Sequence, residues 1–400
     1  MSTVTPQQRA TYPGAIPARL RKLDRSKRLL NLLSRITPRR AASEGSLRRI
    51  GVLLQWGIGD AVLALPLLEG LAQSFSGASI EPIGKPWLAE LFADEKWLGR
   101  THQLVPPWTA YRGKYRIWTQ PWRRFRAELS AIRNIRFDLL IGVRLDPRET
   151  VQLRLLSAGR SAGTLACGGA GWITDPLPMT PEDYYFRYRA EYNTMALKAL
   201  TGREGCPRPR LQVGERLRES AIQKLRAAGY EGGPIVAIHN GAGSPVREWR
   251  PDGYAELLDA ARKLVKFVVV IDDGAAPAGP RVSIPDSIPS MVWKSGLGEL
   301  KGLLSISQVL LCCDSGIMHI GAACGARVVA IFGAGSPEIF FPRGGRHELV
   351  KVDPMPCRPC MDDCIYPSPI CIDRIAAPAV HASLLRALAA SSPDSAARSR

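Results

Sequence analysis

Two strand-turn-helix units, placed far apart in the chain, constrain its fold more than any other feature. An apolar stretch at 48–54 runs into a glycine-rich turn that ends at Asp60, and a second at 309–313 runs into Asp314 and Ser315. Helical periodicity follows each turn. The start of a helix carries unpaired N–H groups and a partial positive charge, so it attracts phosphate and stabilises an ionised Asp beside it. Two such helix starts suit the binding of a nucleotide-sugar and its acceptor.

Apolar β-type stretches alternate with helical periodicity from residue 48 onward. Strands are predicted at 50–54, 138–143, 235–239, 267–271, 309–313 and 327–332. This alternation is typical of an α/β protein, in which helices bury both faces of a parallel sheet. Two prolines in the segment 202–213 favour a linker between two such domains. Pro66 lies inside the helix predicted at 61–75 and should bend or interrupt it.

Composition limits the class of protein. The 400 residues are 46% apolar, which is enough for two domains with sizeable cores. No stretch of the sequence has the length of uninterrupted apolar residues that a transmembrane helix needs. The first residues lack the apolar segment of a secretory signal. We therefore expect a cytoplasmic protein.

Residues 1–47 form a distinct basic leader. Residues 1–50 hold twelve Lys or Arg and two acidic residues, and leucines recur between 18 and 36. A basic amphipathic helix of this kind suits an anionic lipid surface, so we expect membrane contact. The alternative is a solvated leader. A nucleic-acid partner is not expected, because no aromatic residues are interleaved with the basic ones.

A third loop, after the strand predicted at 235–239, has the composition of a phosphate-binding loop. His239 ends the strand, and Gly243, Ser244 and Arg247 follow before the next helix. Backbone N–H groups of such a loop can cradle a diphosphate, and an Arg can neutralise its charge. The alternatives are a surface ion pair for Arg247 and a hydrogen-bonded core position for His239.

The turn after the strand at 309–313 predicts ligand contacts. If the helix begins near Ser315, the N–H groups of Ser315 and Gly316 point toward a ligand, while Asp314 can accept hydrogen bonds from sugar hydroxyls. His319 follows within the next turn of the helix. The alternative for Asp314, as for Asp60, is a residue that only caps a helix.

Four cysteines lie close together in a Pro-rich segment near the end of the chain, namely Cys357, Cys360, Cys364 and Cys371. Four thiols this close in a cytoplasmic chain favour a structural zinc or iron site over disulfides. We expect this segment to be stabilised by a bound metal.

Three motifs follow one another along the chain. They are G-x-G-D-x-x-x-x-x-P at 57–66, H-x-G-A-x-S-x-x-R-x-W-x-P at 239–251 and D-S-G-x-M-H-x-x-A-A-x-G at 314–325. Together they resemble glycosyltransferase family 9, the ADP-heptose:lipopolysaccharide heptosyltransferases. The resemblance covers about residues 48–378, and many members of the family carry a similar cysteine segment.

The resemblance implies a GT-B fold, in which two Rossmann-like domains with parallel sheets face each other across a cleft. The acceptor domain would be 48–210 and the nucleotide-sugar domain 211–378, with a helix and tail at 379–400. It implies inverting transfer of a heptose from ADP-heptose to the lipopolysaccharide inner core or a related glycan or lipid-linked acceptor. No essential catalytic metal is implied. The leader would then contact the cytoplasmic face of the inner membrane.

The resemblance also assigns roles to individual residues. Asp60 matches the family's general base, and Asp314 matches the residue that holds the heptose hydroxyls. The contacts on the diphosphate side are matched by Ser315, Gly316 and His319. Arg247 stands where the family often has a phosphate-binding Lys, so the charge is kept but a planar fork replaces a point charge.

Two departures from the family leave the acceptor open: Trp56 precedes the first glycine, and residues 142–146 replace the usual polar strand end on the acceptor side. The first rival interpretation is another nucleotide-sugar enzyme of the same fold, a hexosyltransferase or an epimerase. A dinucleotide oxidoreductase is weakened because the first loop lacks a full G-x-G-x-x-G. The third rival is a non-enzymatic, metal-stabilised binding module at a membrane.

Overall fold

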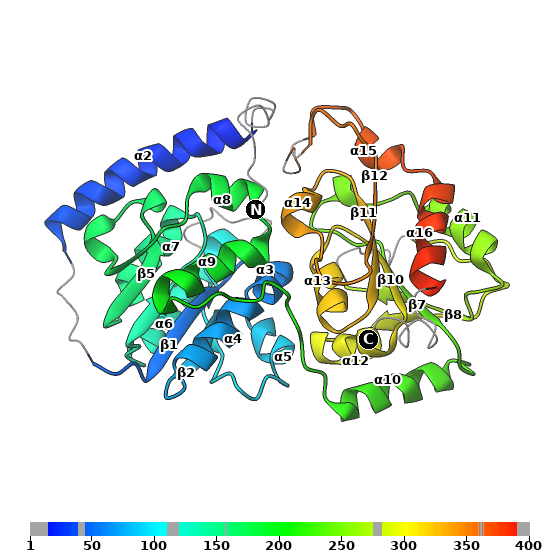
Figure 1. The fold of residues 1–400 in the computed structure, drawn as a ribbon, viewed down its shortest axis with the longest axis horizontal. Coiled ribbons are helices and arrows are strands. Elements are labelled where there is room, and N and C mark those ends of the chain that lie inside the picture. The colour runs from blue at the N-terminus through cyan, green and yellow to red at the C-terminus, as the bar shows by residue number, and fades with distance from the viewer. Residues whose placement is uncertain are drawn as a thin grey trace. The chain divides into compact units, whose positions relative to one another are not determined.

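The computed structural model describes residues 15–38, 45–109, 120–156, 158–274, 282–358, 360, 362 and 364–389. The chain divides into two compact units, Ile16–Pro209 and a second that begins at Arg210. The division lies within the segment 202–213 that we predicted to be a linker. Each unit is a parallel sheet with helices on both faces, as the α/β prediction required (Figure 1).

The sheet of the N-terminal unit has the strand order β3-β2-β1-β4-β5-β6 and is parallel throughout. Ile50 in the central strand pairs with Ile80 on one side and Leu139 on the other. The strands are β1 (Arg49–Leu54), β2 (Ser79–Gly84), β3 (His102–Gln103), β4 (Leu139–Ile141), β5 (Arg160–Thr164) and β6 (Asp175–Leu177). All but the first residue of β1 are buried, which explains its uninterrupted apolar sequence.

Helices cover both faces of this sheet. α4 packs against α9 on one face, and α6 packs against α7 on the other, where Phe125, Leu140 and Leu153 belong to one apolar core. Pro66 interrupts the predicted helix, as expected, because α3 ends at Leu63 and α4 begins at Leu65. The α-helices are α3 (Ile58–Leu63), α4 (Leu65–Ser74), α5 (Trp87–Leu91), α6 (Gln120–Arg133), α7 (Pro147–Leu156), α8 (Pro181–Phe186) and α9 (Arg189–Thr201). Three 3-10 helices join them, η1 (Pro107–Thr109), η2 (Leu165–Cys167) and η3 (Ala170–Trp172).

The basic leader contains the helix α2 (Ala15–Ile36), and here the structure differs from the predicted division of the chain. We placed residues 1–47 outside the acceptor domain, but the described residues 16–38 and 45–47 belong to the N-terminal unit. Ser34 Oγ accepts the Gly171 N–H at 3.2 Å, and Trp172 Nε1 donates to Thr37 O at 2.9 Å. A Cβ at Gly171 would lie 2.5 Å from Ser34 O, so glycine is what allows this close approach. The sequence predicted the helix, but it did not predict that the helix packs on the segment around Gly171 and Trp172.

The sheet of the C-terminal unit has the order β12-β11-β10-β7-β8-β9 and is also parallel. Its strands are β7 (Ile235–His239), β8 (Phe267–Asp272), β9 (Ser290–Lys294), β10 (Val309–Cys313), β11 (Arg327–Phe332) and β12 (Glu348–Lys351). The bounds of β7, β10 and β11 are those predicted. These three strands are adjacent or nearly so at the centre of the sheet, where burial on both faces gives the clearest apolar pattern.

Two pairs of helices cover the faces of the second sheet. α10 packs against α12 on one face and α11 against α16 on the other, with Trp249, Tyr254 and Leu384 in the core beneath the second pair. The helices are α10 (Glu215–Ala227), η4 (Pro245–Arg247), α11 (Pro251–Ala261), α12 (Leu297–Ile306), α13 (Gly316–Ala323), α14 (Pro337–Phe340), α15 (Ile370–Asp373) and α16 (Ala377–Ala389). Within the described part of the chain, no helix combines the length and apolar character needed to cross a bilayer.

Candidate active site

The carboxyl ends of β1 and β4 flank the point where the strand order of the N-terminal sheet reverses, and α/β folds bind ligands at such points. Asp60 follows β1 as the third residue of α3, and the Gly57 N–H donates to its Oδ2 at 3.2 Å. Arg144 follows β4, and its Nη1 lies 2.6 Å from Asp60 Oδ1. The two strands thus bring the predicted base and an arginine together.

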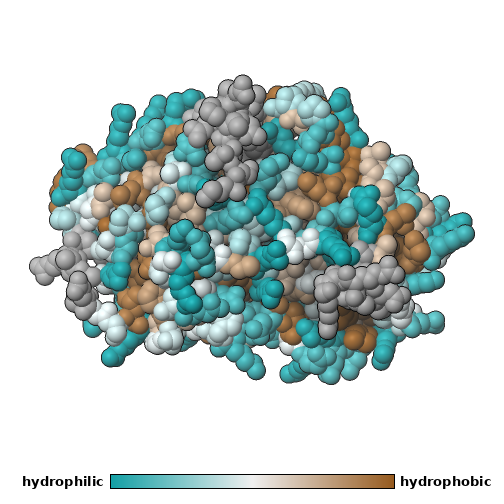
Figure 2. Space-filling model, viewed as in Figure 1, coloured by the Kyte–Doolittle hydropathy of each residue, from teal (hydrophilic) through white to brown (hydrophobic). Residues whose placement is uncertain are grey.

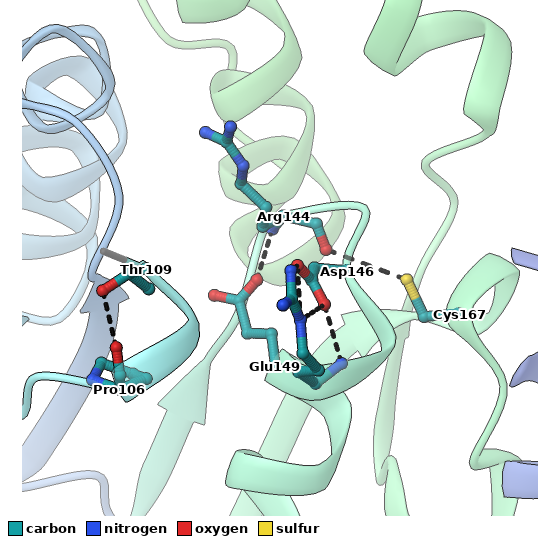
Figure 3. Close-up of polar contacts among 7 residues, drawn as sticks. Pro106, Thr109, Arg144, Asp146, Glu149 and Cys167 are labelled. Atoms are coloured by element: carbon teal, nitrogen blue, oxygen red, sulfur yellow. Dashed lines mark hydrogen bonds and ion pairs between the residues drawn. The ribbon is translucent and has the colours of Figure 1, made fainter. Parts of the chain in front are cut away.

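Neighbouring elements fix both the backbone and the side chain of Arg144. Its N–H donates to Glu149 Oε2 at 2.8 Å, and the Cys167 thiol lies 3.9 Å from its carbonyl oxygen. Figure 3 shows its guanidinium extending away from Glu149, so the side chain and the backbone serve different partners. The guanidinium carbon lies 4.7 Å from the centre of the Trp56 ring, a cation–π contact that helps to orient Arg144.

The electrostatic surroundings of Asp60 keep it ionised. Burial raises the pKa of its carboxyl, but the charges of Arg144 and Arg189 and a backbone N–H outweigh burial, so the pKa lies below its ordinary value. Glu149 is the opposite case, because burial and the charge of Asp146 raise its pKa well above its ordinary value. Of these two carboxyls, Asp60 is therefore the one that can accept a proton at neutral pH.

An aromatic ring links Arg144 to a second arginine. The guanidinium carbons of Arg144 and Arg189 lie 5.6 and 3.8 Å from the centre of the Tyr184 ring, and Arg189 Nη2 donates to Tyr184 O at 2.9 Å. The sequence motifs did not identify any of these three as partners of Asp60. The signal for Arg144 was its place directly after a predicted strand. Tyr184 and Arg189 come from α8 and the start of α9, which carry no motif.

In the C-terminal unit, β7 and β10 flank the corresponding reversal of strand order. Asn240 closes the base of the loop after β7, since its Nδ2 donates to Trp249 O and its Oδ1 accepts the Trp249 N–H, both at 3.0 Å. Gly243 and Ser244 lie in the solvent-accessible part of this loop, and the Arg247 N–H donates to Ser244 O at 3.1 Å. The loop predicted to bind phosphate is thus anchored at its base.

Asp314 follows β10 and is almost completely buried. Burial raises the pKa of its carboxyl, which Arg247 opposes and Asp362 reinforces, and the net pKa lies above its ordinary value. Its Oδ2 lies 3.2 Å from Arg247 Nη1, an ion-pair distance, but it accepts no hydrogen bond from the residues that the structure describes. A Cβ at Gly335 would lie 2.0 Å from this oxygen, so only glycine leaves room for the carboxylate. A buried acceptor of this kind calls for a donor such as a ligand hydroxyl.

The start of α13 is where the sequence predicted it. Ser315 is the N-cap and Gly316 the first helical residue, but the Ser315 hydroxyl makes no capping hydrogen bond. It lies instead 3.2 Å from His239 Nδ1, while His239 Nε2 lies 3.2 Å from Asp273 Oδ2. His239 is thus a buried, hydrogen-bonded residue, which is the alternative to a phosphate-loop role that the sequence had left open. The Ser315 side chain leaves the first N–H groups of α13 to other partners.

His319 lies further along α13, and its buried ring meets the ring of Phe340 at a centre distance of 6.4 Å. Arg247, in contrast, is an ion-paired residue. Its Nε and Nη2 contact the two carboxylate oxygens of Asp362 at 2.7 and 2.8 Å. Arg247 thus contacts carboxylates from the residue after β10 and from the cysteine segment. Asp362 carried no sequence signal beyond its place among the cysteines.

Three of the four cysteines are buried, and two of them, Cys360 and Cys371, lie near residues 333 and 334. Cys360 Sγ lies 4.0 Å from Ala334 O, and a Cβ at Gly333 would lie 3.4 Å from Cys371 Sγ. Cys357 and Cys371 share an apolar cluster, while Cys364 is partly exposed. Nevertheless, no set of three or more His, Cys, Asp or Glu among the described residues is arranged to hold a metal ion.

The part of the chain that holds the second site matches a known family model. Residues 189–367 match the family model of glycosyltransferase family 9 (heptosyltransferase). The chain carries a glycosyltransferase family 9 domain. The resemblance predicted from the motifs is therefore confirmed, and the protein is a glycosyltransferase.

Several solved structures have the same fold as this chain. A family 9 glycosyltransferase from Veillonella parvula has a TM-score of 0.69 at 17% identity, covering 87% of this chain and 99% of that one. The Escherichia coli ADP-heptose lipopolysaccharide heptosyltransferase II has a TM-score of 0.65 at 15% identity, covering 86% and 99%. TibC, an iron-containing dodecameric glycosyltransferase from enterotoxigenic E. coli, has a TM-score of 0.53 at 15% identity, covering 87% of this chain and 77% of that one. A search of curated proteins found no match. The predicted GT-B fold class is confirmed.

Proposed function

We propose that this glycosyltransferase moves a heptose from ADP-heptose, with inversion, to a lipopolysaccharide inner-core sugar or a related glycan acceptor. The heptosyltransferase family model and the similarity to an E. coli ADP-heptose lipopolysaccharide heptosyltransferase support this donor and acceptor class. The observation that carries the proposal is the pair of carboxylates at the two strand-order reversals. Asp60 is ionised beside an arginine, and Asp314 is buried with an oxygen that lacks a donor.

Asp60 acts as the general base in this proposal. The acceptor hydroxyl oxygen attacks the anomeric carbon, its proton passes to Asp60, and the bond from the anomeric carbon to the diphosphate oxygen breaks to release ADP. Attack from the face opposite the leaving group inverts the anomeric configuration. General-base assistance typically contributes about 10²- to 10⁴-fold. A lowered pKa makes Asp60 a weak base that is fully ionised at neutral pH, which favours proton transfer concerted with attack.

The donor would lie against the loop after β7 and the start of α13. Asp314 Oδ2 would accept a hydrogen bond from a heptose hydroxyl, which supplies the donor that this oxygen lacks. Arg247 and the N–H groups of Ser315 and Gly316 would stabilise the charge that develops on the departing diphosphate, together with the loop of Gly243 and Ser244. His319, which lies on α13 beside the Phe340 ring, would contribute to the contacts on the diphosphate side.

We also propose that the outer face of α2 contacts an anionic membrane on the cytoplasmic side. Leu23 and Leu30 are buried, whereas the outer face is mostly basic in its first half and mixes apolar with basic side chains in its second. Among the described side chains of α2, the exposed ones are Arg19, Arg21, Lys22, Asp24, Arg25, Arg28, Leu29, Leu32, Leu33, Arg35 and Ile36. In Figure 2 most of the surface along α2 is hydrophilic, with hydrophobic patches toward its left end. Basic residues attract anionic headgroups, and the leucines supply apolar area.

A structural zinc or iron ion at the four cysteines completes the proposal. Thiolates are the ligands that both metals accept in structural sites, and the similar enzyme TibC contains iron. Cys360 and Cys371 lie beside the residues that follow β11, so a metal there would tie the segment to the end of β11.

The experiment compares donors with one purified protein. We expect ADP-heptose and a truncated lipopolysaccharide acceptor to give a product heavier by one heptose in the mass spectrum, and UDP-sugars to give none. Asp60→Asn keeps the shape and the contact to the Gly57 N–H but loses the proton acceptor, so transfer should fall about 100-fold or more while ADP binding is unchanged. Product from a UDP-hexose would instead favour the hexosyltransferase alternative, and near wild-type turnover of Asp60→Asn would reject Asp60 as base.

A further inference from the structure

Arg247 is held by carboxylates from two distant parts of the chain. Its Nε and Nη2 contact Asp362 at 2.7 and 2.8 Å, and its Nη1 lies 3.2 Å from Asp314 Oδ2. The Arg247 and Asp362 side chains are 24% and 31% exposed, so the pair is partly shielded from water. A two-bond contact of this kind fixes the plane of the guanidinium as well as its position.

The backbone at Asp362 is unusual. Its φ is +72°, in the left-handed region that residues with a Cβ rarely adopt. Such a conformation persists where surrounding contacts hold it in place. Asp362 lies between Cys360 and Cys364, and the described side-chain contact that reaches from it to the donor loop is the pair with Arg247. The turn therefore presents its carboxylate to the loop after β7.

The Arg247 side chain needs an external constraint to have one orientation. Asn240 anchors the loop at Trp249, two residues away, but an Arg side chain has several rotatable bonds with about three wells each. Asp362 occupies the Nε and Nη2 edge, which turns Nη1 toward Asp314. A guanidinium has donors on more than one edge, so binding one anion at one edge can orient another edge toward a second anion.

We propose that Asp362 is a positioning residue that orients Arg247 for the diphosphate of the donor and thereby couples the cysteine segment to donor binding. This inference rests on the proposed function, because it takes Arg247 to be a diphosphate contact. It follows that disorder in the cysteine segment should weaken nucleotide binding through Arg247, without any nucleotide contact from the cysteines being required.

The test is a double-mutant cycle on ADP affinity, measured by calorimetry with the full chain. We expect Asp362→Asn to weaken ADP binding about three- to tenfold, because the competent Arg247 orientation becomes one of several. Asp362→Glu should recover part of the loss. Arg247→Ala should weaken binding further, and adding Asp362→Asn to it should change nothing. Asp373→Asn, an exposed carboxylate of the same segment, is the matched control and should bind as wild type does.

The outcomes distinguish failure of the positioning role of Asp362 from failure of the proposed function. If Arg247→Ala weakens ADP binding but Asp362→Asn does not, the positioning role is wrong and the proposed function stands. If Asp362→Asn tightens binding, Asp362 competes with the diphosphate and the positioning role is again wrong. If Asp362→Asn lowers ADP affinity by the same factor in wild type and in Arg247→Ala, the loss is a general structural effect and the coupling is rejected. If wild-type protein binds no ADP, the donor assignment and this inference fall together.

Discussion

Replacing Arg144 by Met should move the acid limb of the pH–rate profile upward. Arg144 Nη1 lies 2.6 Å from Asp60 Oδ1, and its charge is the largest of the effects that lower the pKa of Asp60. Two unit charges about 4 Å apart interact by about 4 kcal/mol at an effective dielectric constant of 20, or about 3 pKa units. The two side chains are 25% and 27% exposed and Arg189 remains, so we expect a rise of about 1–3 units.

The assay is kcat/KM from pH 4 to 9, which reports the free enzyme's essential groups. In wild type the acid limb of kcat/KM should lie below the ordinary carboxyl range. In Arg144→Met we expect burial to be the dominant effect on the pKa of Asp60, so the acid limb should move up into the measured pH range. Arg148→Met is the matched control, because Arg148 also lies near the Trp56 ring but pairs with Asp146. Its acid limb should stay where it is in wild type. An unmoved acid limb in an active Arg144→Met enzyme would refute the assignment of Asp60 as base.

The shift in the pKa of Asp60 should also change how the free energy of unfolding depends on pH, in the absence of any substrate. The depressed pKa of Asp60 means that its ionised form stabilises wild type above the unfolded value near 3.9, and this contribution is lost as pH falls through the folded pKa. In Arg144→Met we expect burial to raise the folded pKa of Asp60 above the unfolded value, so that stability is instead lost as pH rises through the folded pKa. Urea unfolding should therefore show a gap between the two proteins that widens from pH 4 to pH 7. A constant gap would contradict the pairing.

Three further outcomes are expected. Asp314→Ala should weaken binding of ADP-heptose but leave ADP binding nearly unchanged, since the carboxylate acts on the sugar; equal losses for both ligands in calorimetry would contradict that role. Cys360→Ser should lower both the bound zinc or iron and the melting temperature, and a wild-type protein that is metal-free after purification without chelator would remove the metal site. Leu32→Glu combined with Ile36→Glu should reduce sedimentation with anionic vesicles while turnover on a soluble acceptor persists, and unchanged sedimentation would place the membrane contact elsewhere.

Strands with an uninterrupted apolar sequence could be predicted from the sequence, and strands with mixed composition could not. β7, β10 and β11 are uninterrupted apolar stretches with sharp ends. β2 contains Glu81 and Pro82, and β5 contains Arg160, Ser161 and Gly163, so neither has the apolar pattern of a strand. Their partners in the sheet determine that they are strands.

The residues of the two sites also fall into those that a local sequence pattern predicts and those that only tertiary contacts bring together. Asp60 and Asp314 could be predicted because each follows a central strand at a helix start, a local pattern. Arg144, Tyr184 and Arg189 surround Asp60 through tertiary contacts among β4, α8 and α9, and periodicity does not predict such contacts. Asp362 is 115 residues from Arg247, and its role depends on a turn in the cysteine segment. Motifs thus identify the chemical groups, whereas the charges that tune them come from packing.

The hydrogen bonds that join α2 to η3 have a mechanical consequence. A leader attached only by a flexible linker would leave the enzyme free to tumble beneath whatever surface the leader bound. α2 is instead fastened to the loop after β5, and it extends about 33 Å at 1.5 Å per residue. A surface bound along this rod would set both the height and the tilt of the residues around Asp60. Acceptors whose reactive hydroxyl stands at that height would then be selected by geometry, before any side chain recognises them.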